Sequence, residues 1–173
     1  MNKTIAYNGL VFEPFTENDI EALSPIIKRA FDDDTKIHSF VTGKTEGGPP
    51  GYDDGGFFRE WYLHKDVTSY KISQGEKLIG GIALWINENH INYLGNVFID
   101  PDLQGKGIGK TVWDFAEHTY PETVKWQTDT PWYSRRNLYF YVNKCGFKIV
   151  EIRNINDVGE PCMCFMEKEM GAR

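Results

Sequence analysis

The spacing of hydrophobic residues predicts three consecutive strands in the middle of the chain. Residues 68–73 alternate between apolar and polar side chains, residues 78–87 begin with a continuous apolar run, and residues 91–99 form a third strand-like run. Alternation is typical of a strand with one buried face, and a short apolar run between turns is typical of a strand buried on both faces.

The period changes further along the chain, where two segments carry apolar residues on one helical face. The first face consists of Ile108, Val112, Phe115 and Ala116, and the second of Leu138, Tyr141, Val142 and Cys145. The first helix is predicted to end before Pro121 and the second at Gly146, a typical C-terminal cap. Further strands are predicted at residues 124–128, 147–155 and 162–167. Gly159 and Pro161 are expected in the last turn.

The N-terminal part is predicted to contain one strand and an interrupted helix. An alternating segment from about residue 7 to residue 15 indicates the strand. Thr16 or Asn18 can cap the following helix, and Pro25 is expected to break or restart it. A second helical piece is predicted to end in the acidic triplet of residues 32–34.

The order of the predicted elements indicates the fold class. Residues 43–56 hold six glycines and two prolines and are predicted to form a loop, and residues 57–65 to form a short aromatic helix. Strands come first, followed by strand, helix, strand, helix and strand, which predicts a mixed α/β sheet with at least one parallel crossover. No internal repeat or linker is evident, so residues 1–173 are expected to form a single domain.

Charge and composition disfavour several classes of partner. The 173 residues include 19 Lys and Arg against 25 Asp and Glu, a net charge of −6, which disfavours nucleic acid and acidic membranes. No apolar run approaches 18 residues, and the N-terminus lacks the apolar core of a signal peptide, so we expect a cytoplasmic protein. Cys145, Cys162 and Cys164 are too few for a disulfide framework. The pair Cys162 and Cys164 has no second ligand pair, so we predict free thiols and no metal site.

The segment of residues 96–116 carries the most informative motif. A buried strand ends at Asp100, and Gly105, Gly107 and Gly109 then open a helix. Glycines let consecutive backbone N–H groups point into one concavity beside the positive end of the helix dipole, which suits a pyrophosphate. A glycine-rich helix entry that binds nothing is the alternative.

Spacing separates three phosphate-binding motifs. A P-loop needs a glycine where this chain has Gln104, and the dinucleotide fingerprint needs Gly or Ala where it has Lys110. The pattern Gln-x-x-Gly-x-Gly is matched in full by Gln104, Gly107 and Gly109. This pattern resembles the pyrophosphate loop of the GNAT superfamily, the N-acetyltransferases that use acetyl-CoA.

A second motif extends the resemblance over roughly residues 78–149. The later helix of that family typically ends in a Tyr followed by a few residues and Gly-Phe, which here are Tyr141, Gly146 and Phe147. The Asn often found seven residues before the Tyr is Ser134 in this chain, and Asn137 is the substitute that we expect to contact the pantetheine arm.

The resemblance implies a mostly antiparallel sheet of about six to seven strands flanked by helices, in which a splayed strand pair receives the CoA arm. It implies that residues 1–67 shape the acceptor site, that residues 68–149 bind acetyl-CoA, and that residues 150–173 add C-terminal strands. The backbone of Phe98 and Ile99 is expected to contact the thioester and pantetheine. The residues expected at the pyrophosphate are Gln104, Gly105, Lys106, Gly107, Ile108, Gly109 and Lys110.

The implied reaction transfers an acyl group from sulfur to an amine. An ammonium group with a pKa of about 10.4 must first lose a proton, so a base or a water chain is needed. Tyr141 is the predicted acid that protonates the departing thiolate, and an ordinary core tyrosine is the alternative. Asp129 and Glu88 are candidate bases, but each is expected to be a solvated surface carboxylate. The four histidines are expected to be exposed and neutral, so no base is assigned.

The predicted function is acetylation of a small cationic primary amine by direct attack in a ternary complex, by a monomer or homodimer. The alternatives are a protein N-terminal or lysine acetyltransferase and a non-catalytic acyl-CoA sensor. Residues 1–60 carry 6 Lys and Arg against 11 Asp and Glu, a balance of −5. We therefore expect residues 32–34 with Asp53 and Asp54 to attract a cationic acceptor.

Overall fold

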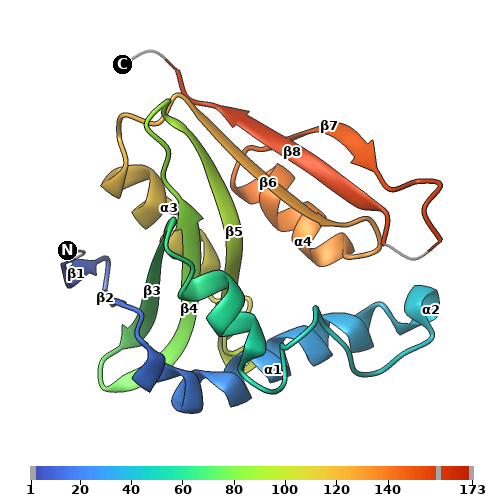
Figure 1. Ribbon diagram of the computed structural model, residues 1–173, viewed down its shortest axis with the longest axis horizontal. Helices are drawn as coiled ribbons and strands as arrows, with labels where there is room; N and C mark the ends of the chain where they lie inside the picture. The colour runs from blue at the N-terminus through green and yellow to red at the C-terminus, as the bar shows by residue number, and fades with distance from the viewer. Residues whose placement is uncertain (1–2, 159–160, 172–173) are drawn as a thin grey trace.

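Eight strands form one sheet in a computed structural model that describes residues 3–158 and 161–171 (Figure 1). The strands are β1 (Ile5–Tyr7), β2 (Leu10–Pro14), β3 (Val67–Gln74), β4 (Lys77–Trp85), β5 (Ile91–Ile99), β6 (Lys125–Pro131), β7 (Lys148–Arg153) and β8 (Met163–Glu169). Their order is β1-β2-β3-β4-β5-β6-β8-β7, and every neighbouring pair is antiparallel except β5 and β6. The predicted mixed sheet with a parallel crossover is confirmed. Gly159, expected in the last turn, lies outside the described residues.

The sheet has one strand more than predicted because the N-terminal segment folds back on itself. Asn8 and Gly9 have φ angles of 46° and 81°, and positive φ at both central residues is what a two-residue hairpin turn requires. Ile5 is therefore paired with Phe12, and the single predicted strand is a β1–β2 hairpin.

The helices are α1 (Ile20–Ile37), α2 (Ser39–Thr42), α3 (Ile108–Thr119) and α4 (Arg135–Tyr139). Short turns supplement them: η1 (Glu17–Asp19) and η3 (Pro101–Leu103) are 3₁₀ turns, and η2 (Phe58–Tyr62) and η4 (Phe140–Lys144) are π turns. The predicted aromatic helix of residues 57–65 is thus the short turn η2.

The predicted break of α1 at Pro25 is wrong. The start of the helical segment is fixed upstream, where Thr16 donates from both its N–H and its hydroxyl to Asp19, each over 2.8 Å. Pro25 removes only the helical bond to the carbonyl of Glu21, an exposed residue whose carbonyl can bond to water instead. The helix continues unbroken, so the acidic triplet lies inside it and not at its end.

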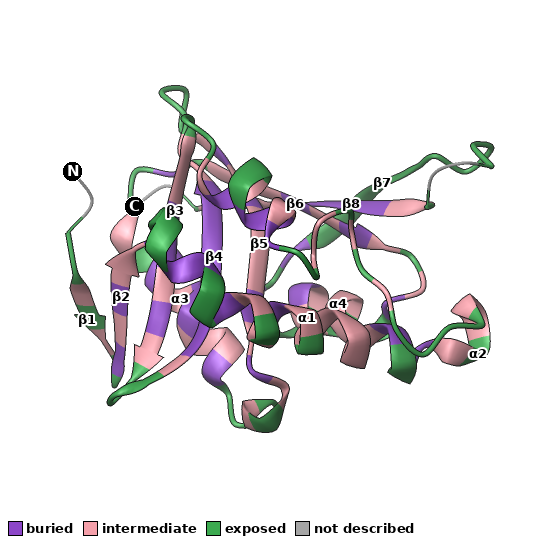
Figure 2. Ribbon diagram, turned by 60° about the horizontal axis from the view of Figure 1, so that its bottom comes forward, coloured by how far each residue is buried: buried purple, intermediate pink, exposed green. Residues whose placement is uncertain are grey.

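Two hydrophobic cores cover the two faces of the first five strands. On one face α3 packs against the sheet, with the ring of Phe115 stacked on Phe12 at a centroid distance of 3.6 Å. On the other face α1 and η2 cover the sheet, and Phe58 and Tyr62 pack around Phe98. Figure 2 accordingly shows β4 buried along most of its length.

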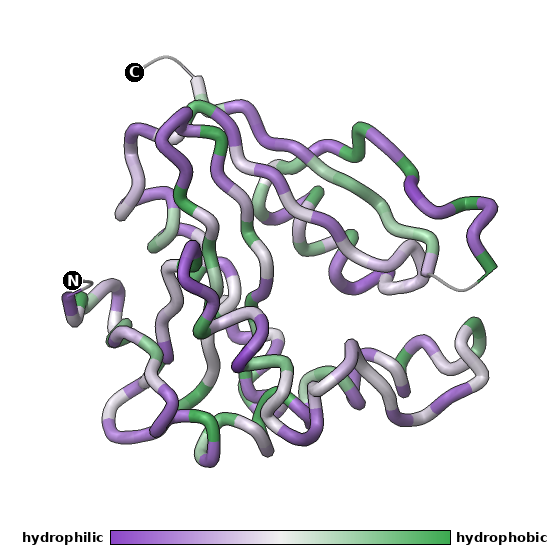
Figure 3. Tube along the Cα trace, in the orientation of Figure 1, coloured by the Kyte–Doolittle hydropathy of each residue, from purple (hydrophilic) through white to green (hydrophobic). Residues whose placement is uncertain are grey.

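The far edge of the sheet is much less covered. Every residue of β7 is exposed, and hydrophobic and hydrophilic residues alternate along β7 and the segment after it (Figures 2 and 3). Within residues 3–158 and 161–171, no helix is long and apolar enough to cross a membrane.

Candidate active site

The parallel strands β5 and β6 separate soon after they begin. Only Ile91–Tyr93 of β5 pairs with residues of β6, namely Lys125, Trp126 and Gln127. The hydroxyl of Thr128 then donates to the carbonyl of Leu94 over 2.9 Å, and beyond this bond the two strands diverge (Figure 1). We call this point, formed by Leu94 and Thr128, the fork. It is the splayed strand pair that the sequence predicted.

The backbone of β5 beyond the fork is available on one edge. The N–H of Asp100 donates to Ile79 of β4 over 2.7 Å, and the carbonyl of Phe98 lies 2.1 Å from where a Cβ on Gly80 would stand. Both groups therefore face β4, and strand alternation places the N–H groups of Val97 and Ile99 on the opposite edge, toward the gap. Of the two predicted residues, Ile99 offers its backbone to the gap and Phe98 does not, and Val97 was missed.

A bulge at Gly95 lies next to the fork. Ala83 pairs with Asn96 and Leu84 with Leu94, so Gly95 is the extra residue. A Cβ on Gly95 would lie 2.1 Å from Cζ3 of Trp85, so the Trp85 ring occupies the space that only glycine leaves open. An isolated glycine inside a strand pattern is the sequence signal that could have indicated this bulge.

The glycine-rich loop leads from the end of β5 into α3. Gly105 and Gly107 have φ angles of 75° and 79°, and Gly107 is the residue before the first turn of α3. Helix geometry leaves the first N–H groups of α3 without acceptors inside the helix, so they can bind an anion. Residues 104–107 are exposed, whereas the Lys110 ammonium is held by Asp114 within the helix.

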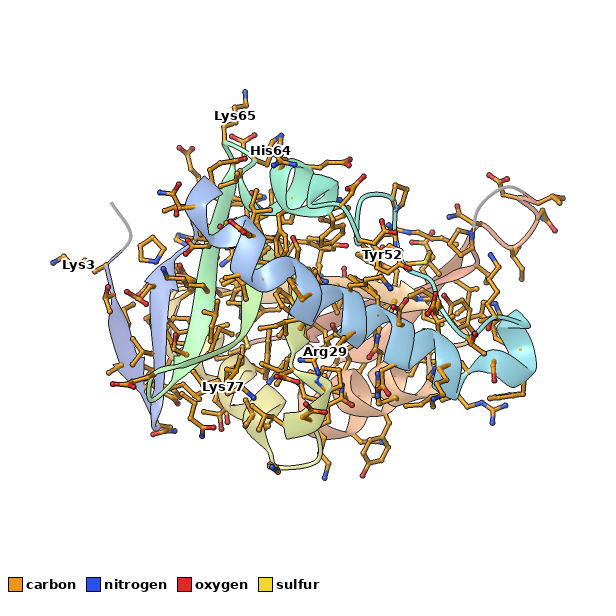
Figure 4. The ribbon with its side chains drawn as sticks, turned by 90° about the horizontal axis from the view of Figure 1, so that it is seen from below. Lys3, Arg29, Tyr52, His64, Lys65 and Lys77 are labelled. Atoms are coloured by element: carbon orange, nitrogen blue, oxygen red, sulfur yellow. The ribbon has the colours of Figure 1, made fainter. Side chains whose placement is uncertain are left out.

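Asp100 anchors the start of this loop to α1 and β4. Its carboxylate is only 2% exposed and lies 3.0 Å from Arg29 of α1 and 3.2 Å from Lys77 of β4, two residues labelled in Figure 4. The N–H of Asp102 also donates to it over 3.1 Å. Burial disfavours the charged form, but these three partners outweigh that effect, and the pKa of Asp100 lies below its usual value.

Arg136 of α4 connects the two sides of the gap. Its Nη1 donates over 2.6 Å both to Gln104 in the loop and to Asp33 of α1, and its Nη2 lies 3.4 Å from Asp34. The acidic triplet is thus engaged by partners within the chain, since Asp32 also accepts from Tyr52 of the 43–56 loop over 3.0 Å. This loop therefore lies against α1, where Figure 4 labels Tyr52.

Tyr141 lies in the turn η4, directly beside the fork. Its side chain is buried, with 8% exposed, and its ring packs edge-on against Phe147 at a centroid distance of 5.9 Å. Burial raises the pKa of Tyr141 above its usual value, and a hydrogen bond with Thr128 acts in the opposite direction. The hydroxyl therefore stays protonated at neutral pH and can donate a proton or a hydrogen bond. This fits an acid, and the role stays a prediction.

Ser134 and Asn137, the two residues compared with the family's Asn, are in different surroundings. Ser134, which stands where the family often has Asn, is fully buried and donates to Asp34 over 3.0 Å. Asn137 is half-buried and donates to the hydroxyl of Thr130 at the end of β6 over 3.3 Å. Asn137 is therefore on the gap side of α4, and its contact with pantetheine stays a prediction.

Asp129 is the carboxylate that the sequence misjudged. It was expected to be a solvated surface group, but it is partly buried on β6 and accepts a hydrogen bond from Tyr93 of β5 over 3.0 Å. Glu88 is exposed in the turn between β4 and β5, as expected. The partner Tyr93 lies 36 residues away in sequence, so no local pattern could have indicated the pair.

His38 also differs from its expectation. It is buried, and its Nδ1 lies 2.7 Å from the carbonyl of Asp34. Cys145 and Cys164 are buried free thiols and Cys162 is half-buried. Among the described residues, no group of three or more His, Cys, Asp or Glu side chains is arranged to hold a metal ion.

Comparison with known proteins gives relatives over most of the chain. A Bacillus subtilis (strain 168) protein named uncharacterized protein YrkN is 36% identical over 147 residues, which cover 84% of this chain and 76% of that protein. The fold is similar to the ribosomal-protein-S18-alanine N-acetyltransferase of Escherichia coli, with a TM-score of 0.69, 13% identity, and 95% and 96% of the two chains covered.

The fold is also similar to the PaiA N-acetyltransferase of Thermoplasma acidophilum in complex with coenzyme A, with a TM-score of 0.63, 19% identity, and 93% and 99% of the two chains covered. The sequence pattern of the acetyltransferase (GNAT) family matches residues 26–147, a range that includes the fork, the glycine-rich loop and Tyr141. The chain therefore belongs to the acetyltransferase (GNAT) family.

Proposed function

We propose that this chain transfers the acetyl group of acetyl-CoA to a primary amine by direct attack in a ternary complex. The observation that carries the proposal is the fork, where unpaired backbone amides of β5 face a gap that Tyr141 flanks and that opens toward the first turn of α3. The solved PaiA structure contains coenzyme A, and its fold is similar to this one.

Acetyl-CoA, when bound, supplies the thioester that reacts. The loop of residues 104–107 and the first N–H groups of α3 are the proposed ligands of its pyrophosphate, and Asn137 is the proposed ligand of its pantetheine arm. The N–H groups of Val97 and Ile99 can donate to the oxygen that becomes negative during attack, because they are fixed in the strand before the reaction. The Tyr141 hydroxyl is placed to give a proton to the leaving sulfur.

We further propose that the acceptor is a small cationic amine handled in the cytoplasm. The chain has a net charge of −6, and Asp53 and Asp54 are exposed in the 43–56 loop, where they can attract a cation. The E. coli structure with a similar fold is named for a ribosomal protein as its substrate, so a protein acceptor is the alternative to test.

Two measurements on the purified protein test the proposal. Calorimetric titration with acetyl-CoA should give saturable binding, and the release of free CoA thiol should accelerate when small primary amines are added. Faster release with peptides than with small amines would indicate the protein acetyltransferase. Binding without release for any amine would indicate a sensor, and no acetyl-CoA binding at all would show the proposal to be wrong.

A further inference from the structure

One face of β6 and its neighbours carries a row of polar and aromatic side chains next to the fork. On β6, Trp126 and Thr128 are buried toward α3, so Asp129 between Thr128 and Thr130 points to the opposite face. Asp129 is in register with Phe165 of β8, which is in register with Glu151 of β7. We call this the open face, because in Figure 1 α4 lies behind these strands and no helix lies in front of them; Phe165 on this face is only 8% exposed.

Aromatic rings lead from η2 across the sheet to Asp129. The rings of Trp61 and Trp85 meet edge-on at a centroid distance of 5.5 Å, and those of Trp85 and Tyr93 meet at 5.8 Å. The Tyr93 hydroxyl then donates to Oδ1 of Asp129 over 3.0 Å. The row thus ends at the Asp129 carboxylate, and the Tyr93 hydroxyl fixes the orientation of that carboxylate.

The second oxygen of Asp129 is available to a ligand. Within the described part of the chain, Asp129 accepts a hydrogen bond only at Oδ1 and has no ion pair within 4 Å, although the charge of Arg153 acts on it from a longer distance. The charged group that faces it from β7 is Arg153, which is held by Glu151 over 2.8 Å and lies 3.8 Å above the ring of Phe165. A fixed carboxylate with one free oxygen beside aromatic rings is the chemistry that binds an ammonium group.

The carboxylate also has the right position for the reaction. Asp129 is the residue directly after Thr128, so it stands at the fork, and its charge acts on the Tyr141 hydroxyl. Tyr141 reaches the fork from η4 on one side of the sheet, whereas Asp129 projects from the other side. An amine bound to Asp129 therefore meets the gap from the side opposite the proposed acid.

We propose that Asp129, oriented by Tyr93, binds the reacting ammonium group of the acceptor and accepts its proton, while the rings of Tyr93, Trp85 and Trp61 bind the body of the amine. In this step an N–H bond of the ammonium breaks, an O–H bond forms on Asp129, and the nitrogen keeps the electron pair with which it attacks. The inference rests on the proposed function and adds to it the acceptor class, a small amine with a flat or alkyl body.

The test compares Asp129→Asn with Glu88→Gln, which removes one negative charge from the exposed turn before β5 without touching the fork. The probes are 2-phenylethylamine and n-butylamine, with 2-phenylethanol as the uncharged analogue, titrated by calorimetry into protein saturated with CoA. We expect both amines and not the alcohol to bind wild type, and Asp129→Asn to lose at least tenfold in amine affinity and at least a hundredfold in kcat/KM. Glu88→Gln should stay within twofold of wild type.

Two further measurements separate the possible failures. Acetyl-CoA affinity and thermal unfolding of Asp129→Asn should match wild type, which shows that cofactor binding and folding are intact. Tyr93→Phe keeps the Asp129 carboxylate but removes the hydrogen bond that orients it. The KM for the amine should therefore rise several-fold, with a smaller change in kcat. Equal amine binding by wild type and Asp129→Asn, or no amine binding by wild type, would overturn the inference while acetyl-CoA binding still supports the proposed function.

Discussion

The sheet is built differently on the two sides of the fork. Strands β1 to β5 are antiparallel throughout and have a hydrophobic core on each face, one under α3 and one under α1 and η2. Strands β6 and β8 bury one face against the helices, β7 is exposed along its whole length, and the open face carries polar groups that include Asp129, Glu151 and Arg153. The backbone hydrogen bonds that join the two sides are confined to the start of β5 and β6.

This difference separates the residues that stabilise the fold from those that can do chemistry. Burial of apolar area is the dominant favourable term in folding, and the first side has it on both faces of its strands. The second side gives up one such face, and the proposed acceptor approaches the fork from that face. The site lies where the two sides meet, so the residues that position it must make contacts between the two sides.

The largest expected effect is on stability. Phe12→Ala should lower the free energy of unfolding by about 3–5 kcal/mol, because Phe12 is fully buried and stacked on Phe115. Ile152→Ala on β7 should cost less than about 1 kcal/mol, because that side chain is 46% exposed. Urea unfolding measures both variants, and equal losses would show that the two sides are not different in this way.

The second effect concerns Asp100, which ties the loop to the first side. Asp100→Asn should cost about 1.5–3 kcal/mol at neutral pH, because hydrogen bonds to a charged group are lost. The pKa of Asp100 in the folded protein lies below the unfolded value of about 3.9, so the stabilisation is present above that value and is lost as the pH falls through the folded pKa.

Urea unfolding at several pH values measures this change. The difference in stability between wild type and Asp100→Asn should shrink toward zero in acid. Asp102→Asn is the matched control, because the side chain of Asp102 is exposed and its pair with Arg29 should contribute little. A difference that stays constant from neutral pH to acid would contradict the role given to Asp100.

The third effect is on turnover and tests the fork itself. Tyr141→Phe should lower kcat at least tenfold and leave the affinity for acetyl-CoA nearly unchanged, because only the hydroxyl group is removed and the buried ring keeps its place. Tyr139→Phe on the same helix segment is exposed and serves as the control. Unchanged turnover in Tyr141→Phe would leave Tyr141 as a core residue only.

The local elements of this fold could be predicted from the sequence because each depends on neighbours in the chain. The strand of residues 91–99 and the helix that begins at Ile108 have the predicted positions, since periodicity and glycine punctuation are local signals. Pro25 was misjudged because its cost depends on whether the freed carbonyl can reach water, which the tertiary fold decides.

The contacts that assemble the site depend on residues far apart in sequence. Tyr93 and Asp129 come from strands that are adjacent only after the crossover is made, and Arg136 meets Gln104 across 32 positions. The motif that begins at Gln104 predicted the loop. The motif carries no information about which side chains elsewhere in the chain hold the loop in place. Sequence reasoning therefore located the glycine-rich loop before α3 and wrongly expected Asp129, the carboxylate beside the fork, to be solvated.

The smallest expected effect concerns Arg136, which crosses from the second side to the loop and to α1. Arg136→Gln should change the free energy of unfolding by no more than about 1 kcal/mol, because the guanidinium is partly exposed and its ion pairs are screened by salt. Arg59→Gln, which removes an exposed pair with Glu17 on the first side only, should change it by a similar amount.

The two variants should differ in where they loosen the protein. Hydrogen exchange should become faster in the loop of residues 101–107 and in the last turns of α1 when Arg136 is replaced, because Gln104 and Asp33 then lose their shared partner. Arg59→Gln should leave exchange in both segments as in wild type. Unchanged exchange in Arg136→Gln would mean that the loop is held by Asp100 without help from Arg136.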